Sequence, residues 1–370
     1  MPLAGLMSDC TSNKTNAKIA VIAAFVCVVV LSVSSLHVLT TLGDDTNFTL
    51  RESSDGNLYY VNVTGDYAFD KYMATGSTST DELFDFLSEN VTCGKRLAGF
   101  VPQGCSVFTV KDSFDGGYLA GRNFDYYQTI VGVVYTHGKN IYNSVSTVDL
   151  AMFSGVNATY YSMMHDTALN AAAYLPLDGI NEKGVFVAIN SVSGGPALVE
   201  EDPAKTTLFI TSSLRAVLDH CDSTASAVEL LKSYNLHSNS NYHVFISDRG
   251  GNSVTVEVCD GKTYVTETDV LTNHYLTKEG SAPDVPVKES STERFDIMTQ
   301  KLKEQPTMTV KEVKNVLISV KQNDDDLVHY TRWSVVYDFD TLDISLYLRI
   351  GTEMDYDHPY TYNVSGWGIA

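Results

Sequence analysis

The sequence is short of the residues that build metal sites and disulfide scaffolds. Its 370 residues include only six cysteines, without any Cys-x-x-Cys pair, and no cysteine–histidine cluster has metal-ligand spacing. Basic residues are also scarce, with 25 Lys and Arg against 45 Asp and Glu, so the net charge is −20. Binding to nucleic acid needs basic patches, which this balance disfavours. We therefore expect no metal, no cofactor and no nucleic-acid partner.

Long uncharged hydrophobic runs are absent except near the start of the chain. Residues 19–39 are apolar and long enough to cross a bilayer as a helix. Lys14 and Lys18 precede this run and acidic residues follow it, which predicts a cytoplasmic tail at residues 1–18 and a signal-anchor at 19–39. A cleaved signal peptide is the alternative. Both interpretations export the rest of the chain, and the membrane is then a partner through the N-terminal segment.

Export has two further consequences. The product would be a membrane-anchored or secreted glycoprotein with a lumenal or extracellular domain. The candidate glycosylation sequons are Asn47, Asn62, Asn90, Asn157 and Asn363.

The exported cysteines other than Cys105 allow at most one disulfide. Cys221–Cys259 is the pairing we expect, with Cys93 left over, and a pairing that uses Cys93 is the alternative.

The order of the predicted elements indicates a fold class. Strand patterns and helix pairs follow each other in blocks, and alternating strand–helix–strand units are missing, so this order disfavours a doubly wound parallel sheet. Two antiparallel sheets stacked between two helical layers would use these blocks economically. The sequence thus predicts one α+β domain of four layers. The expected helices span 79–87, 206–220, 223–234, 290–304 and 309–322, and the expected strands span 48–51, 58–63, 105–110, 118–126, 131–137, 146–153, 185–192, 242–248, 253–259, 262–267, 270–273, 333–339 and 342–350.

The stretch from Gly104 to Tyr127 carries the candidate chemistry. Two alternating apolar runs flank an Asp-Gly-Gly turn, which is the pattern of a β-hairpin. The hairpin folds Arg122 and Asp125 back towards Cys105. A buried core cysteine beside an ordinary Arg–Asp pair is the plain interpretation, because a cysteine without a disulfide is usually a small core hydrophobe.

The Gly104–Cys105 bond allows a second interpretation. The thiol can attack the preceding carbonyl, and hydrolysis of the resulting thioester makes Cys105 a new N-terminus. Its α-amine, with an ordinary pKa of roughly 8, then lies beside its own thiol. One residue would hold both the nucleophile and its general base, and Arg122 would favour the thiolate.

Five sequence blocks point to a known family. They are Cys-Ser-x-Phe with Gly-Arg-Asn-Phe-Asp-Tyr at 105–126, Asp-Gly-Ile-Asn-Glu-Lys-Gly-Val at 178–185, Val-Leu-Thr-Asn at 270–273, Ser-Ser-Thr-Glu-Arg-Phe at 290–295 and Trp-Ser-Val-Val-Tyr-Asp at 333–338. In this order they resemble the choloylglycine hydrolase family, which includes bile salt hydrolases and penicillin V acylases and is related to acid ceramidase and N-acylethanolamine acid amidase. The resemblance implies a four-layer αββα N-terminal-nucleophile hydrolase sandwich. It also implies hydrolysis of linear amides that join an apolar acyl group to a small polar amine.

The resemblance also implies site residues. Cys105 corresponds to the nucleophile, and Arg122 and Asp125 correspond to the pair that orients it. Asn273 and Asn190 correspond to residues that bind the oxyanion, and Arg294 to the second arginine of the site. The run before Asn190 is one residue shorter than in the bile salt enzymes, which leaves Ile189 as the alternative there. Without the family, Asn273 would be read as a turn residue and Arg294 as a surface charge.

The long segment before Cys105 sets this chain apart from many bacterial members. It resembles the ceramidase-like lysosomal relatives that cut themselves at the cysteine in an acidic compartment. The resemblance therefore implies autocleavage at Gly104–Cys105 and makes the lysosome one candidate compartment. Residues 40–104 would be a pro-segment that blocks the site until cleavage, and residues 105–370 the catalytic domain. The alternatives are an acylase of the bile-salt or penicillin V type and a membrane-anchored binding protein that keeps the fold without catalysis.

Overall fold

The computed structural model describes residues 46–97, 105–192, 202–259, 262–277, 289–323 and 330–366. The predicted membrane segment at 19–39 and the Gly104 side of the predicted cleavage bond lie outside these ranges. Within the described ranges, no helix is long and apolar enough to cross a membrane. Anchoring and export therefore stay predictions.

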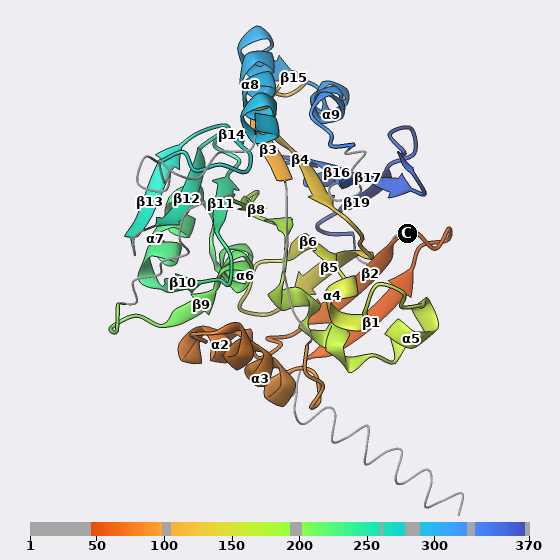
Figure 1. Ribbon diagram of the computed structural model, residues 1–370, viewed down its shortest axis with the longest axis vertical. Coiled ribbons are helices and arrows are strands. Elements are labelled where there is room, and N and C mark those ends of the chain that lie inside the picture. The colour runs from red at the N-terminus through yellow and green to blue at the C-terminus, as the bar shows by residue number, and fades with distance from the viewer. Residues whose placement is uncertain are drawn as a thin grey trace, which may run out of the picture.

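Two β-sheets stacked face to face form the middle of the molecule (Figure 1). The larger sheet has nine strands in the order β1-β2-β5-β6-β7-β8-β11-β12-β13. All of its neighbouring strands are antiparallel except β2 and β5, which are parallel. Its strands are β1 (Asn47–Glu52), β2 (Tyr59–Thr64), β5 (Val131–His137), β6 (Ser144–Asp149), β7 (Asp178–Asn181), β8 (Phe186–Ser191), β11 (Tyr242–Ser247), β12 (Ser253–Cys259) and β13 (Lys262–Glu267).

The other sheet has eight strands and holds the predicted hairpin at its centre. Its order is β14-β3-β4-β16-β17-β18, with β15 beside β3 and β19 beside β17. Only β15 and β3 run parallel among these pairs. Its strands are β3 (Cys105–Asp112), β4 (Tyr118–Tyr126), β14 (Val270–Leu271), β15 (Thr307–Met308), β16 (Tyr330–Asp338), β17 (Asp343–Ile350), β18 (Glu353–Met354) and β19 (Tyr360–Asn363).

Helices cover the outer faces of both sheets. Two of them, α8 (Glu289–Glu304) and α9 (Val310–Ser319), lie over β3, β4 and β16 at the top of Figure 1 and enclose a small apolar cluster around Phe108 and Met298. On the opposite side, α6 (Ile210–His220) packs on β7 and β8, and α7 (Thr224–Ser233) packs on β11 and β12. The main apolar core lies between the sheets and continues under α6. The predicted α+β, αββα sandwich is confirmed.

The segment before Cys105 is part of this architecture. Strand β2 joins the larger sheet through parallel pairing with β5, and Val61 is fully buried there. Helices α2 (Phe69–Thr75) and α3 (Thr80–Asn90) follow, and the Ser79 side chain accepts a hydrogen bond from the backbone N–H of Glu82, as its capping pattern predicts. Residues 46–97 therefore share the core of the domain and do not form a separate unit.

Some local predictions differ from the structure. The helix expected at 206–220 begins as a strand, β9 (Thr207–Phe209), which pairs with β10 (Asn235–His237). The strand expected at 146–153 ends at Asp149, because that carboxylate accepts the backbone N–H of Ala151 at 3.0 Å and starts a helical turn. Short helical elements that the sequence analysis did not anticipate are α4 (Ala151–Ser154), α5 (Tyr160–Met164) and the 3-10 helix η1 (Thr167–Tyr174).

Two predictions about modification are corrected. The expected Cys221–Cys259 disulfide does not form, because the two residues lie in different apolar clusters, Cys221 in the main core and Cys259 beside Val192 and Tyr275. Asn62 is only 5% exposed within β2, so it cannot carry a glycan in this fold. Asn47 and Asn157 are exposed and remain candidates.

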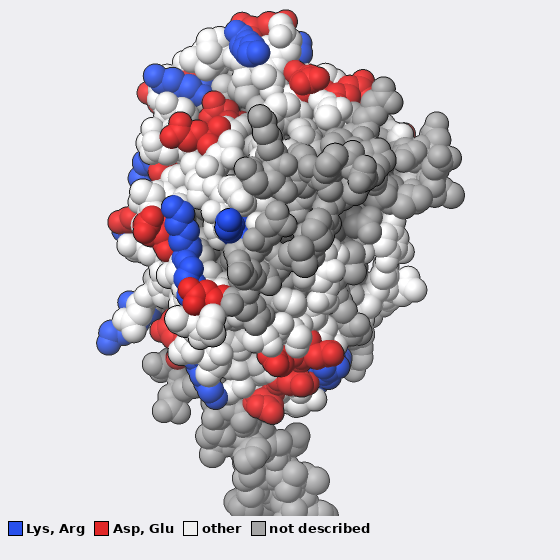
Figure 2. Space-filling view, turned by 60° about the vertical axis from the view of Figure 1, so that its left-hand side comes forward, with Lys and Arg blue, Asp and Glu red and all other residues white. Residues whose placement is uncertain are grey.

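The surface agrees with the acidic composition. On the face drawn in Figure 2, Lys and Arg side chains are scattered and mostly have Asp or Glu side chains close by. The described residues on that face form no broad basic patch.

The burial of Val61 gives a test of how firmly the N-terminal segment belongs to the domain. Val61→Thr places a hydroxyl in the core at almost unchanged volume, so we expect the free energy of unfolding to fall by about 1 to 3 kcal/mol. Thr361→Val, at an exposed position on β19, is the control and should change it little. Urea denaturation measures both. Equal stability of Val61→Thr and wild type would show that the segment is an independent appendage.

Candidate active site

Cys105 is the first residue of β3 and is buried, with 1% of its surface exposed. It pairs with Phe124 on β4, and the next inward-facing pair is Val107 with Arg122. Diagonal neighbours on one face of a sheet lie within reach of a long side chain. The Arg122 guanidinium accordingly donates from Nη2 to the Cys105 Sγ at 3.2 Å.

Arg122 does not pair with Asp125 as the plain interpretation of the hairpin assumed. Its ion-pair partner is Asp178 on β7 of the facing sheet, with Nε and Oδ2 2.9 Å apart and both side chains fully buried. The same guanidinium donates to the Ile189 carbonyl at 2.8 Å and to Asn190 Oδ1 at 3.2 Å. One arginine thus connects the cysteine to two strands of the other sheet.

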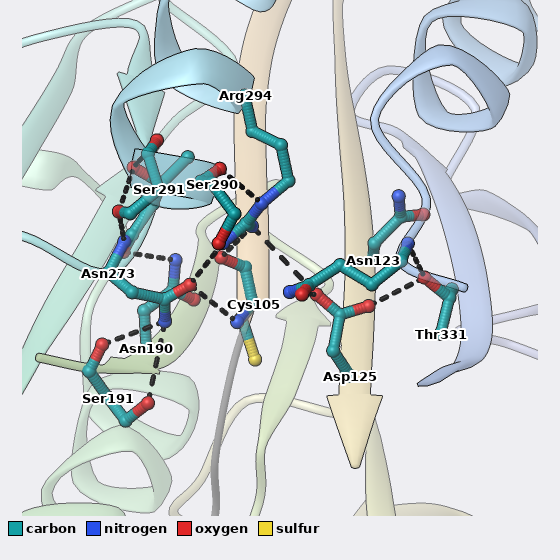
Figure 3. A network of polar contacts seen from close by, with 12 residues as sticks. Cys105, Asn123, Asp125, Asn190, Ser191, Asn273, Ser290, Ser291, Arg294 and Thr331 are labelled. Atoms are coloured by element: carbon teal, nitrogen blue, oxygen red, sulfur yellow. Dashed lines mark hydrogen bonds and ion pairs between the residues drawn. The ribbon is translucent and has the colours of Figure 1, made fainter. Parts of the chain in front are cut away.

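Asp125 points to the opposite face of the hairpin. Its carboxylate accepts hydrogen bonds from Thr331 Oγ1 at 2.6 Å and Gln322 Nε2 at 2.8 Å, and it lies 3.8 Å from Arg294 Nη1. Burial raises the pKa of Asp125, while Arg294 and Thr331 oppose that rise. The carboxylate is therefore held from the helical side of the sheet (Figure 3).

A β-bulge sets this arrangement. Strand β16 pairs Thr331 with Asp125 and Trp333 with Phe124, so Arg332 is an extra residue between two consecutive pairs. The bulge lets Thr331 reach Asp125, while Trp333 stacks on Phe124 between the sheets with ring centroids 4.0 Å apart. Bulges of this kind commonly redirect side chains beside functional sites.

The backbone of Cys105 is held by two further predicted residues (Figure 3). Its nitrogen donates to Asn273 Oδ1 at 3.2 Å, and its carbonyl accepts from Arg294 Nη1 at 2.9 Å. Arg294 Nη2 also donates to Asn273 Oδ1 at 2.8 Å, so the arginine and the amide brace each other. Arg294 lies one turn inside α8 and is 7% exposed, which corrects its interpretation as a surface charge.

Both predicted asparagines lie beside this cysteine, but their amide nitrogens already have acceptors. Asn273 Nδ2 donates to the Ser191 carbonyl at 2.8 Å, and Asn190 Nδ2 donates to the Thr272 carbonyl at 3.1 Å. Each amide nitrogen also has a longer contact, from Asn190 to the Leu271 carbonyl at 3.5 Å and from Asn273 to Ser191 Oγ at 3.4 Å, and an oxyanion would replace these. The structure thus brings together Cys105, Arg122, Asp125, Asn190, Asn273 and Arg294, which the sequence analysis selected.

A buried His–Glu pair supports the loop that carries Asn273. His243 lies opposite Asn190 in the sheet, and its Nε2 is 2.9 Å from the Thr272 carbonyl. Its Nδ1 lies 3.1 Å from Glu257, whose carboxylate also accepts the backbone N–H groups of Leu276 and Thr277. The sequence analysis assigned no role to His243, Asp178 or Glu257. Asp178 opens one of the family blocks, which was the available signal for it.

Burial disfavours the thiolate form of Cys105. Burial raises the pKa of Cys105 to about 12, although Arg122 and a hydrogen bond from the backbone of Asp125 favour the thiolate. A thiolate at neutral pH therefore needs a further positive charge or a base beside the sulfur.

Comparison with known proteins now adds to this geometry. The acyl-coenzyme A:6-aminopenicillanic acid acyl-transferase family matches residues 115–351, which is more than half of the chain. The chain belongs to this family. The match to the acyl-transferase family starts within the turn after β3, so Cys105 itself lies outside the matched residues. No match was found among curated proteins.

One solved structure supports a shared fold, and a second is given for comparison. A variant of conjugated bile acid hydrolase from Clostridium perfringens has a TM-score of 0.50 at 15% identity, covering 70% of this chain and 97% of that one. Penicillin V acylase from Agrobacterium tumefaciens has a TM-score of 0.49 at 18% identity, covering 68% of this chain and 84% of that one. The resemblance predicted from the sequence blocks thus holds at the level of an N-terminal-nucleophile hydrolase fold, while the family shown is the acyl-transferase one.

The His243–Glu257 pair predicts a pH-dependent contribution to stability. Burial alone would raise the pKa of Glu257, but His243 and the N–H donors lower it overall. A carboxyl group whose pKa is lower in the folded than in the unfolded chain stabilises the fold above the unfolded pKa of about 4.3. That stabilisation is lost as the pH falls through the folded pKa. We expect Glu257→Gln to reduce the free energy of unfolding at pH 7 by about 1.5 to 3 kcal/mol, because a neutral amide replaces the charged acceptor of the hydrogen bonds from His243, Leu276 and Thr277.

The difference between Glu257→Gln and wild type should narrow as the pH falls below about 4.3. Denaturant titrations between pH 3.5 and 7 measure it. Glu267→Gln, at the exposed end of β13, is the control. A difference that stays constant with pH would contradict an ionised Glu257.

Proposed function

We propose that this member of the acyl-transferase family is a cysteine N-terminal-nucleophile amidohydrolase. It cleaves its own Gly104–Cys105 bond and then hydrolyses linear amides of N-acyl compounds through an acyl-enzyme thioester. The observation that carries the proposal is that separate groups hold the nitrogen, the carbonyl and the sulfur of Cys105. Asn273 holds the nitrogen, Arg294 the carbonyl and Arg122 the sulfur.

Self-cleavage proceeds in two steps. The Cys105 sulfur attacks the carbonyl carbon of Gly104, its proton passes to the leaving nitrogen, and the amide becomes a thioester. Water then adds to the thioester, which frees the Gly104 carboxylate and restores the thiol. The new α-amine, with an ordinary pKa of roughly 8, supplies the base or positive charge that the buried thiol lacks.

Turnover repeats this chemistry on an external amide. The thiolate attacks the acyl carbon, the tetrahedral oxyanion accepts hydrogen bonds from the side-chain N–H groups of Asn190 and Asn273, and the amine leaves with a proton from the α-ammonium. Asp125, held by Thr331 and Gln322, balances the charge of the ammonium and of Arg294. Water then releases the acid and restores Cys105.

Acyl transfer is the second candidate. The family name describes transfer from acyl-coenzyme A to an amine, and the same thioester would serve if an amine replaced water in the second step.

A membrane-anchored or lysosomal location remains part of the proposal and depends on residues 19–39.

Self-cleavage is tested on the full chain by intact mass and N-terminal sequencing. We expect one fragment to begin with Cys105 and Cys105→Ala to remain uncleaved. Cys221→Ala is the matched control, because Cys221 is another buried thiol whose pKa burial raises to about 12. The two wild-type fragments should elute together under native conditions, since β2 pairs with β5. Amide turnover by a chain with an intact 104–105 bond would contradict the mechanism.

Amidase and transferase activities are separated on the same preparations. A panel of N-acylethanolamines, ceramide, glycine and taurine conjugates and penicillin V reports hydrolysis. An acyl thioester offered with a free amine reports transfer. Loss of both activities in Cys105→Ala supports the enzyme, whereas ligand binding without any turnover by wild type would favour a binding protein.

The Thr331 hydroxyl predicts a shift of the pH profile. Its hydrogen bond lowers the pKa of Asp125, so Thr331→Val should raise that pKa. A hydrogen bond to a charged group contributes about 1.5 to 3 kcal/mol, so the acid limb of the pH–rate profile should move up by about one to two pH units. Thr109→Val removes another buried hydroxyl, on β3, and is the control. An unchanged acid limb in Thr331→Val would contradict the need for an ionised Asp125.

A further inference from the structure

A small cavity lies next to the strand that holds Asp125. Its volume is about 230 Å³, and its wall includes Arg332, Arg349, Asn57, Tyr59, Thr129 and Leu348. The residues come from the β1–β2 turn, the connection between β4 and β5, and strands β16 and β17. We call it the arginine cavity.

Backbone contacts fix the two arginines of this cavity side by side. Arg332 Nε donates to the Tyr126 carbonyl at 2.9 Å, and Arg349 Nε donates to the Thr331 carbonyl at 2.7 Å. Both guanidinium groups lie over the Tyr330 ring, with their carbons 5.7 and 4.9 Å from its centroid. Held in this way, the two cations cannot swing apart into solvent without losing these contacts.

The charge of the pair is not balanced within the described part of the chain. Arg349 directs its terminal nitrogens to the neutral oxygens of Thr352 and Asn323, and Arg332 makes no hydrogen bond there through its own terminal nitrogens. Neither arginine has a carboxylate within ion-pair distance among the described residues. Such a pair is unexpected in a chain with 45 acidic and only 25 basic residues.

Nearby carboxylates are engaged elsewhere. Asp149 accepts the backbone N–H groups of Ile130 and Ala151, and Asp55 accepts hydrogen bonds from Ser53, Asn57 and Tyr360. Burial and the neighbouring Arg349 lower the pKa of Arg332, whereas Tyr330 and Asp149, which lies beyond ion-pair distance, raise it. The lowering prevails, so the positive charge of the pair is only partly offset. An anion in the cavity would remove this repulsion.

We propose that the arginine cavity binds an oxyanion group, a carboxylate or a phosphate, with the terminal nitrogens of Arg332 as its principal donors. A planar guanidinium presents two parallel N–H groups to such an anion. The volume fits a small anionic group and is below that of a pocket for a whole drug-sized ligand.

The position of the bulge links this cavity to the candidate active site. Arg332 is the extra residue of the β16 bulge, beside Thr331, which holds Asp125. Cys105 lies two strands away, so the backbones of Arg332 and the nucleophile are about 10 Å apart. The anionic group belongs either to the N-acyl amide itself, which rests on the proposed function, or to a separate small anion.

Binding is tested first with inorganic phosphate at constant ionic strength, by calorimetry and thermal unfolding of the full chain. We expect phosphate to stabilise wild type and Arg332→Met to weaken its binding by about tenfold to a hundredfold. Arg332→Lys keeps the charge but loses the planar guanidinium, so its affinity for phosphate should lie between those of wild type and Arg332→Met. This variant also tests the site if Arg332→Met does not fold. Arg51→Met is the control, since Arg51 also lies over a tyrosine ring but outside the cavity. Equal phosphate effects on wild type and on the Arg332 variants, or none on wild type, would overturn the site.

The source of the anion is tested with two substrates that share one acyl chain, an N-acylglycine and an N-acylethanolamine. If the substrate carries the anion, Arg332→Met should raise KM for the glycine conjugate about tenfold and leave the neutral amide unchanged. If the anion is separate, phosphate should change kcat/KM for both substrates in wild type and not in the variant. Absence of turnover by wild type would count against the proposed function, whereas the phosphate titration still decides the site. If Arg332→Met changes neither the kinetics nor the binding of phosphate, the arginine cavity is not an anion site.

Discussion

The guanidinium of Arg122 is the contact on which the candidate site depends. It lies between the two sheets, where it reaches the Cys105 sulfur from one sheet and Asp178, Ile189 and Asn190 from the other. Removing a buried charge from water is unfavourable unless ion pairs and hydrogen bonds replace the lost hydration. Asp178 and the oxygens of β8 provide that replacement here. The position of the thiol is therefore tied to the stacking of the sheets and not to the hairpin alone.

The hairpin separates two kinds of contact to the cysteine. Between the sheets, Arg122 approaches the sulfur. On the helical side, Arg294 and Asp125 lie near the Cys105 backbone, with Thr331 and the bulge at Arg332 keeping the carboxylate in place. A nucleophile at the end of a strand can be reached from both faces in this way, which a residue in the middle of a buried strand cannot.

The segment before Cys105 and the domain after it form one folding unit. Strand β2 lies within the larger sheet, so the residues that would precede a cleavage site share a core with the residues that follow it. Such a chain would fold before it is cut, and its core, not the peptide bond, would hold the fragments together. The raised pKa of the Cys105 thiol is consistent with a dormant site before a new amine exists.

Local patterns in the sequence determined the hairpin at Cys105, most helices and strands, and their order. The choice of site residues came from the resemblance of five sequence blocks to a known family. Apolar periodicity, turn residues and capping residues act over a few positions, so they can be read without knowing the fold. Only the tertiary structure decided that Arg122 pairs with Asp178 and not with Asp125, because that contact depends on how one sheet faces the other. The same holds for the place of β2 beside β5, the separation of Cys221 from Cys259 and the two arginines over Tyr330. Contacts between charges far apart in the chain follow from sheet stacking and strand register, which no short stretch of sequence specifies.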